Sequence, residues 1–219
     1  MALDEERHSK ALEIELISDP EQKARQEAKN GLRQFDEVIE LINYWLQPDR
    51  PFKLRLSAIL SLHRRALEGI SSFAGVFRPG GIEIKGSKHT PPGAHLVAEN
   101  IEQMCDYIND NWAKASPLHL AAYTLWRMNW IHPFVDGNGR TSRVVSYLVL
   151  CVRLGYVLPG TLTIPEQISR NKTPYYQALE AADTANASGK LDLAVMEQLL
   201  ESLLANQLVS VLDSARTGK

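Results

Sequence analysis

The sequence has few of the features that mark disulfide-rich, nucleic-acid-binding or membrane proteins. Its two cysteines, Cys105 and Cys151, both lie in apolar helical patterns, so we expect buried thiols in a reducing compartment and neither a disulfide nor a metal pair. The 24 Lys and Arg residues are balanced by 26 Asp and Glu residues, which leaves no basic field for nucleic acid. No apolar run approaches membrane-spanning length, and residues 1–10 are too charged for a signal peptide. We therefore expect a cytoplasmic protein with no nucleic-acid or membrane partner.

Helical periodicity accounts for most of the chain. Apolar residues recur three and four positions apart, which predicts an all-α domain large enough for one buried core. The pair Asn30-Gly31 predicts the end of a first, polar helix, and residues 144–154 are apolar on nearly all sides, as in a central helix. The expected helices cover residues 19–30, 35–46, 56–70, 96–112, 117–131 and 144–154, with one that begins at 173 and one from about 192 to 212.

Residues 75–92 break the helical pattern. This segment contains four glycines and three prolines, and between them Ile82, Glu83, Ile84 and Lys85 alternate between apolar and charged. Such alternation, bounded by turn residues, predicts a short β-hairpin or extended flap on the helical body.

The stretch from His132 to Arg143, with the sequence HPFVDGNGRTSR, lies between two expected helices. Gly137, Asn138 and Gly139 can turn successive backbone N–H groups toward an anion, and the start of the following helix adds its positive end. Arg140 and Arg143 are one helical turn apart, so two guanidinium groups could hold two phosphates of one nucleotide.

Two further side chains of this stretch add chemistry to the anion site. The Asp136 carboxylate would repel a phosphate unless a cation lay between them, and Mg²⁺ commonly binds through one carboxylate and substrate phosphates. A neutral imidazole at His132 could accept a proton from an attacking hydroxyl, and we expect the helix end and the arginines to lower its pKa. Each feature alone is common, whereas their combination indicates a nucleotide polyphosphate site.

The same stretch resembles the Fic family signature, His-Pro-Phe-x-Asp/Glu-Gly-Asn-Gly-Arg-x-x-Arg, at every specified position. Leu62-His63, the segment 74–78 and Asn129-Trp130-Ile131 are also similar to the family pattern. The resemblance implies a Fic-type helical domain with a small β-hairpin flap. It divides the chain into an N-terminal helical extension at 1–35, the Fic core at 36–204, and the end of the C-terminal helix with its tail at 205–219.

The resemblance also implies an activity. Fic enzymes mostly transfer AMP from ATP to a Ser, Thr or Tyr hydroxyl of a protein, or of themselves, and release pyrophosphate, so a protein adenylyltransferase is expected. By resemblance His132 is the general base, Asp136 holds Mg²⁺, residues 137–139 form the anion hole, Arg140 binds the β-phosphate and Arg143 reaches the γ-phosphate. Gly139 stands where phosphorylating members carry lysine, which favours AMP transfer.

Other roles follow from the same resemblance. The flap from Ile82 to Lys85 is expected to dock the target backbone by strand pairing, and Tyr175 and Tyr176 are candidates for the adenine pocket. Many members are held inactive by a glutamate that pairs with the second motif arginine. Glu27 is the candidate partner of Arg143, although Lys23 stands where a hydroxyl residue is expected, and Glu13 is a second candidate for the inhibitory residue.

Several alternatives stay open at the level of sequence. The chain could be a catalytically silent module that binds nucleotide or a partner, or it could remove AMP from modified proteins. A separate antitoxin or inhibitor could regulate it, and the apolar stripe of the last helix could either pack on the core or form a homo-oligomer.

Overall fold

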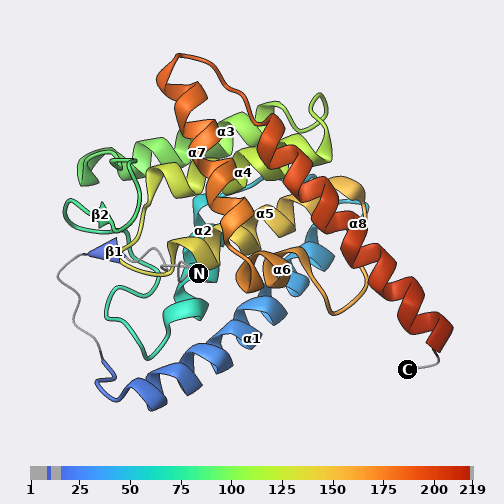
Figure 1. Cartoon of the computed structure of the whole chain (residues 1–219), viewed down its shortest axis with the longest axis horizontal. Coiled ribbons are helices and arrows are strands. Elements are labelled where there is room, and N and C mark those ends of the chain that lie inside the picture. The colour runs from blue at the N-terminus through green and yellow to red at the C-terminus, as the bar shows by residue number, and fades with distance from the viewer. Residues whose placement is uncertain (1–8, 11–15, 218–219) are drawn as a thin grey trace.

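Figure 1 shows the computed structural model of the chain, which describes residues 9–10 and 16–217. Helices dominate these residues, so the all-α class is confirmed. The elements in chain order are β1 (Ser9–Lys10), α1 (Pro20–Trp45), α2 (Leu56–Leu67), β2 (Glu83–Ile84), the short 3₁₀ turn η1 (Ala94–Leu96), α3 (Val97–Asp110), α4 (Pro117–Ile131), α5 (Asn138–Leu154), α6 (Ile164–Arg170), α7 (Thr173–Ala187) and α8 (Ala194–Thr217). No described helix is both long and apolar enough to cross a membrane.

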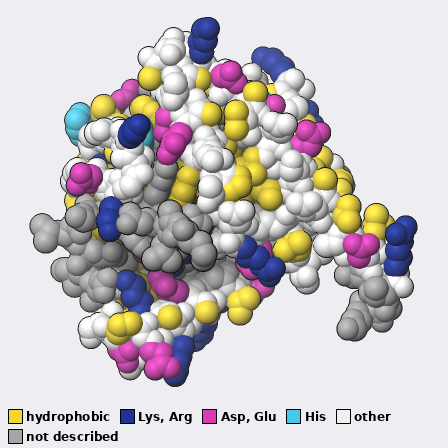
Figure 2. Space-filling view, in the orientation of Figure 1, with side chains coloured by type: hydrophobic (Ala, Val, Ile, Leu, Met, Phe, Trp, Pro, Cys, Tyr) yellow, Lys and Arg dark blue, Asp and Glu magenta, His cyan; other side chains and the backbone are white. Residues whose placement is uncertain are grey.

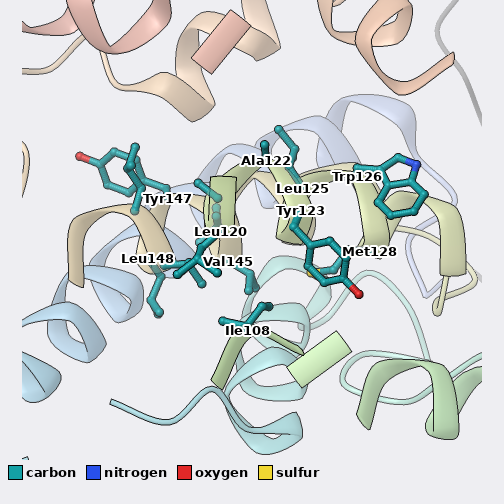
Figure 3. Packing of buried hydrophobic residues seen from close by; sticks show 14 of the residues in the cluster. Ile108, Leu120, Ala122, Tyr123, Leu125, Trp126, Met128, Val145, Tyr147 and Leu148 are labelled. Carbon is teal, nitrogen blue, oxygen red and sulfur yellow. The ribbon is translucent and has the colours of Figure 1, made fainter. Parts of the chain in front are cut away.

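The packing of α4 against α5 forms the centre of the molecule. Leu120 and Leu125 of α4 and Val145 and Leu148 of α5 are fully buried, and Figure 3 shows their side chains packed together. Full burial of each such side chain contributes roughly 1.5–3 kcal/mol. The prediction of a central helix at 144–154 is confirmed, and this helix begins earlier, at Asn138, inside the motif itself.

Several helix ends follow the expected capping chemistry. The Ser116 side chain accepts a hydrogen bond from the His119 N–H at 3.0 Å at the start of α4, and Gly155 ends α5 with a φ of 89°. Helix α6 was not predicted, although Thr163 caps it and is followed three residues later by Glu166. That spacing is typical of a capping box at the start of a helix. A helix of seven residues is too short to show a clear apolar periodicity, so the sequence pattern did not predict it.

Helix α1 does not stop at Asn30-Gly31, so this prediction was wrong. Asn30 is fully buried, and its Nδ2 donates to the carbonyl of Glu68 at 2.8 Å, just beyond the end of α2. Contacts between α1 and α2 therefore outweigh the cost of about 1 kcal/mol for a glycine inside a helix. Helix α1 spans the expected division at 35/36, and α8 spans the one at 204/205, which was placed within the C-terminal helix. The division itself stays a prediction.

The flap has the expected alternation but is not a hairpin of its own. Ile82 and Ile84 are half-buried, Glu83 and Lys85 are exposed, and β2 pairs in antiparallel fashion with β1, Ser9 opposite Ile84. The prolines that flank β2 have no backbone N–H to donate to a second flap strand, and the glycines beside it favour turns. The partner of β2 comes instead from a distant part of the sequence.

The first half of helix α8 packs on the core, and its last turns are exposed to solvent. Met196 and Leu200 are buried against the core, whereas Val209 and Leu212 are 53% and 59% exposed. Figures 1 and 2 show the last turns of α8 projecting beyond the rest of the molecule.

Candidate active site

The motif turn, residues 132–137, joins the end of α4 to the start of α5. His132 ends α4 in the left-handed conformation, with φ 50° and ψ 61°, and is the one non-glycine residue with positive φ in the part of the chain that the structure describes. Gly137, with a φ of 75°, precedes the first residue of α5. Two left-handed residues therefore bracket the turn, and the second suits glycine because it has no Cβ.

The Asn138 side chain closes this turn from inside. Its Oδ1 accepts from the Phe134 N–H at 2.9 Å, and its Nδ2 donates to the Phe134 carbonyl at 2.8 Å. The amide is therefore occupied within the turn, and an anion would be bound by backbone N–H groups of the turn and of the first turn of α5. Phe134 itself is fully buried, as expected for an anchor of the loop.

His132 is held in the neutral state. Its side chain is 8% exposed, and burial, with a smaller contribution from the Arg78 and His89 charges, lowers its pKa to about 4. The sequence predicts a pKa lowered by the helix end and the motif arginines, whereas in the structure burial is the main cause. Nδ1 lies 3.3 Å from the carbonyl of Asn129, which favours the proton on Nδ1 and the basic lone pair on Nε2.

Three charged side chains alternate in sign beside the turn. Arg140 donates from Nη2 to Asp136 Oδ2 at 2.8 Å and from Nη1 to Glu27 Oε1 at 3.3 Å. Glu27, on α1, thus pairs with Arg140, one helical turn before the expected Arg143. The other inhibitory candidate, Glu13, lies outside the described residues.

These groups open into a pocket of about 700 Å³. Small-molecule sites commonly have volumes of about 300–1,000 Å³, so the pocket has room for a nucleotide. The predicted site residues that line it are His132, Asp136, Gly137, Asn138, Gly139, Arg140, Arg143, Glu27, Ile84, Tyr175 and Tyr176. Segments far apart in the sequence therefore meet at one cavity, and Lys23, Lys172 and Asp183 line it in addition.

Residues 53–150 match the sequence model of the Fic/DOC family. The chain belongs to the Fic family. It is 33% identical over 156 residues to the protein adenylyltransferase Fic of Drosophila willistoni, a match that covers 70% of this chain and 29% of that protein. It is 29% identical over 150 residues to the protein adenylyltransferase fic-1 of Caenorhabditis briggsae, covering 68% and 28%. The chain thus spans less than a third of the length of these curated relatives.

Solved structures show the same Fic fold. A Fic-domain-containing signalling protein from Bacteroides thetaiotaomicron superposes with a TM-score of 0.72 at 21% identity, covering 92% of this chain and 76% of that one. Fic-1 from C. elegans gives a TM-score of 0.66 at 22% identity, covering 87% and 52%. The resemblance stated from the motif therefore extends to almost the whole described chain.

The two candidate adenine residues differ in their surroundings within this Fic domain. Tyr175 is buried, which raises its pKa to about 12, whereas Tyr176 is half-buried, and their ring centroids are 5.7 Å apart. Tyr175 thus belongs mainly to the core, and Tyr176 has more surface to offer a ligand. Contact of either ring with adenine stays a prediction.

The acidic residues of the pocket suit Mg²⁺ carried in by a nucleotide. Among residues 9–10 and 16–217, no three His, Cys, Asp or Glu side chains cluster as metal ligands. Mg²⁺ needs no such cluster, because it can take one carboxylate and complete its octahedron with phosphates and water. Asp136, at the pocket and partly exposed, provides one such carboxylate.

Two buried side chains lie behind the turn, His63 on α2 and Arg78 at the root of the flap. Both belong to segments that resemble the family pattern, but the sequence analysis assigns neither of them a role. A polar residue at a core position of an amphipathic helix was the available signal, because such a group must find hydrogen-bond partners.

Proposed function

We propose that this Fic domain transfers AMP from ATP to a Ser, Thr or Tyr hydroxyl of a protein and releases pyrophosphate. The observation that carries the proposal is a neutral, buried His132 in a pocket that Arg140 and Arg143 also line. The curated relatives named protein adenylyltransferase support the same reaction.

In the proposed reaction, Nε2 of His132 removes the proton from the acceptor hydroxyl. The hydroxyl oxygen attacks the α-phosphorus of ATP, the bond from that phosphorus to the bridging oxygen of the β-phosphate breaks, and pyrophosphate leaves. The product is a phosphodiester between the target side chain and AMP. No covalent intermediate with the enzyme is required, so positioning and electrostatic stabilisation supply the catalysis.

The rest of the motif would hold the triphosphate. Backbone N–H groups of Gly137, Asn138 and Gly139 would face the α- and β-phosphates, and Arg140 and Arg143 would bind the β- and γ-phosphates. A Cβ at Gly139 would lie 3.1 Å from Nη1 of Arg143. Glycine at this position therefore lets the Arg143 guanidinium group lie where it does without a steric clash. Mg²⁺ bound at Asp136 would neutralise the charge that develops on the phosphates.

We propose that a target docks its backbone along the flap at Ile82 to Lys85. Support comes from β1, which already pairs with β2 there, with Ser9 opposite a residue that lines the pocket, Ile84. The edge therefore accepts an antiparallel strand, as in other cases of strand addition. An incoming target would displace β1.

We propose that Glu27 regulates access of ATP. Its ion pair with Arg140 competes with a β-phosphate for the same guanidinium, so the pair has to open or be shared when nucleotide binds. A separate inhibitor protein would act at the same ion pair, whereas a homo-oligomer would form through the exposed apolar residues Val209 and Leu212 of α8. We assign the reaction to the cytoplasm on the basis of the buried thiols of Cys105 and Cys151.

The test is incubation of the purified protein, with and without a lysate, with ATP labelled at the α- or the γ-phosphate. AMP transfer labels protein from the α-phosphate alone, and mass spectrometry then locates the adduct. His132→Ala should lower the rate by about 10²–10⁴-fold, the usual contribution of a general base. Calorimetric binding of ATP without any transfer would instead support the silent module.

A further inference from the structure

Two polar side chains from outside the motif contact its turn from the buried side. His63 is 0% exposed and Arg78 is 3% exposed. Burial of a polar or charged group is costly unless its hydrogen bonds are made. The partners of these two side chains therefore indicate what they do.

His63 has one defined tautomer. The Gly75 N–H donates to Nδ1 at 2.9 Å, so Nδ1 is an acceptor and the ring proton is on Nε2. Nε2 then donates to the carbonyl of Asp136 at 2.9 Å. The ring thus connects the root of the flap to the backbone of the residue proposed to hold Mg²⁺.

The His63 ring is also fixed by packing. It stacks on Phe134 with centroids 3.6 Å apart and an interplanar angle of 6°. A Cβ added at Gly137 would lie 3.3 Å from its Cδ2 and Nε2. The ring is therefore in direct contact with Phe134, and it fills the space that a side chain at residue 137 would need.

Arg78 holds the other end of the same turn. Its Nε donates to the carbonyl of His132 at 2.8 Å, and its backbone N–H donates to the carbonyl of Pro133 at 2.9 Å. Its remaining guanidinium nitrogens donate to Gly80 and Pro92, at the two ends of the flap. One side chain therefore stabilises the left-handed His132 and closes the flap.

We propose that His63 and Arg78 are positioning residues that fix the two ends of the motif turn from the root of the flap, Arg78 at His132 and His63 at Asp136. Their contacts fall on the carbonyls of residues 132, 133 and 136, the two ends of the turn. The segment that would dock the target and the segment that would hold the nucleotide are thus connected through two side chains. The kinetic consequence rests on the proposed AMP transfer.

A matched pair of variants separates the two hydrogen bonds of His63. In His63→Asn the amide oxygen can replace Nδ1 as acceptor for Gly75, and the donor to Asp136 is lost. In His63→Gln the amide nitrogen can replace Nε2 as donor to Asp136, and the acceptor for Gly75 is lost. The proposal predicts that His63→Asn raises the Mg²⁺ concentration for half-maximal activity on the order of 10-fold, the usual size for a residue behind a metal ligand, and that His63→Gln largely restores it.

Arg78→Lys tests the other end of the turn. Lysine keeps the charge and loses the planar fork that reaches the carbonyls of His132, Gly80 and Pro92. A base displaced by about 1 Å lowers kcat on the order of 10²-fold, so kcat should fall while the Mg²⁺ requirement and KM for ATP stay unchanged.

Binding measured by calorimetry separates this proposal from the proposed reaction. If the parent transfers nothing, weaker Mg²⁺-dependent ATP binding by His63→Asn than by His63→Gln still supports the role of His63. The proposal is overturned if the two His63 variants have the same Mg²⁺ dependence, or if Arg78→Lys changes the Mg²⁺ requirement instead of kcat. Melting temperatures of all variants show how much of any loss is a loss of fold.

Discussion

The motif turn and the flap lie side by side at one pocket and are built in opposite ways. In the turn, Asn138, His63 and Arg78 satisfy backbone groups from the buried side, and His132 is neutral and nearly inaccessible. In the flap, Glu83 and Lys85 are exposed, and a two-residue strand makes the pairing. The proposed chemistry would thus use a part of the molecule held by buried hydrogen bonds, and the proposed docking would use a backbone edge held by one short strand pairing.

A glycine from each region provides the sharpest test of this contrast. Gly137→Ala places a Cβ on a residue with a φ of 75° and brings it to 3.3 Å from His63. Strain of this kind costs on the order of 1–3 kcal/mol, and transfer activity should fall with it. Gly80→Ala, in the flap, is the control, because its Cβ would have no neighbour within 4 Å.

Thermal unfolding measures both glycine variants. We expect a clear fall in melting temperature for Gly137→Ala and a change within experimental scatter for Gly80→Ala. Equal effects would mean that the turn is no more constrained than the flap.

The pH dependence of activity probes the buried turn without mutation. The active form of His132 is neutral and its pKa is about 4, so the rate should persist well below pH 6.5 and fall as the pH approaches 4. The free energy of unfolding changes with pH in the same direction as the rate. Protons bind the unfolded histidine near pH 6.5 and the folded one only near pH 4, so unfolding becomes easier as pH falls through that interval.

The measurement is single-turnover transfer between pH 4 and pH 8, with chemical denaturation in the same buffers. His63, whose pKa is also lowered to about 4 by burial, adds to the loss of stability. An acid limb of the rate centred near 6.5 would contradict a buried, neutral base.

The flap is expected to respond to changes in the backbone and little to changes in side chains. Glu83→Pro removes one N–H from β2, and a lost hydrogen bond of about 0.5–1.5 kcal/mol corresponds to a several-fold lower rate on a protein target. ATP binding and melting temperature should not change. Lys85→Ala, beside the strand, is the matched control, and a larger effect of Lys85→Ala would show that side chains direct docking.

The smallest effect is expected at the contact between α1 and the motif. Glu27→Gln removes the charge that faces Arg140, and a partly exposed ion pair is worth about 0.2–1 kcal/mol, so ATP affinity should rise a few-fold at most. Glu21→Gln is the control, because Glu21 pairs with Arg25 on the exposed side of the same helix. Calorimetric titration with ATP distinguishes the two variants, and equal affinities would remove Glu27 from the regulation of the site.

The sequence predicted that the motif residues share one site, because they are contiguous. The residues from His132 to Arg143 lie on and beside a turn that their own glycines permit, and the structure brings them to one pocket, whereas their chemical roles stay predictions. The sequence did not predict the continuity of α1, because the partner of Asn30 is the carbonyl of Glu68, which no local pattern relates to it. The sequence did not predict the pairing of β1 with β2 for the same reason, because the two strands are far apart in the chain.

The partner chosen by Glu27 depended on geometry of a similar kind. The position of a residue of α1 beside the first turns of α5 is decided by how the two helices pack, which no local pattern gives, and the expected pair of Glu27 with Arg143 stays a prediction. His63 and Arg78 were within reach as polar residues in buried patterns, although their targets, main-chain carbonyls 73 and 54 residues away, were not.

The pairing of β1 with β2 has a consequence for the choice of target. Because β1 is tethered to the same chain, its effective concentration at the flap edge is on the order of millimolar, whatever the concentration of the enzyme. A free protein at micromolar concentration cannot compete for that edge by backbone pairing alone. If targets dock at the flap as proposed, we expect them to be selected by the additional surface they bind beyond it, and raising their concentration would be a poor substitute for that surface.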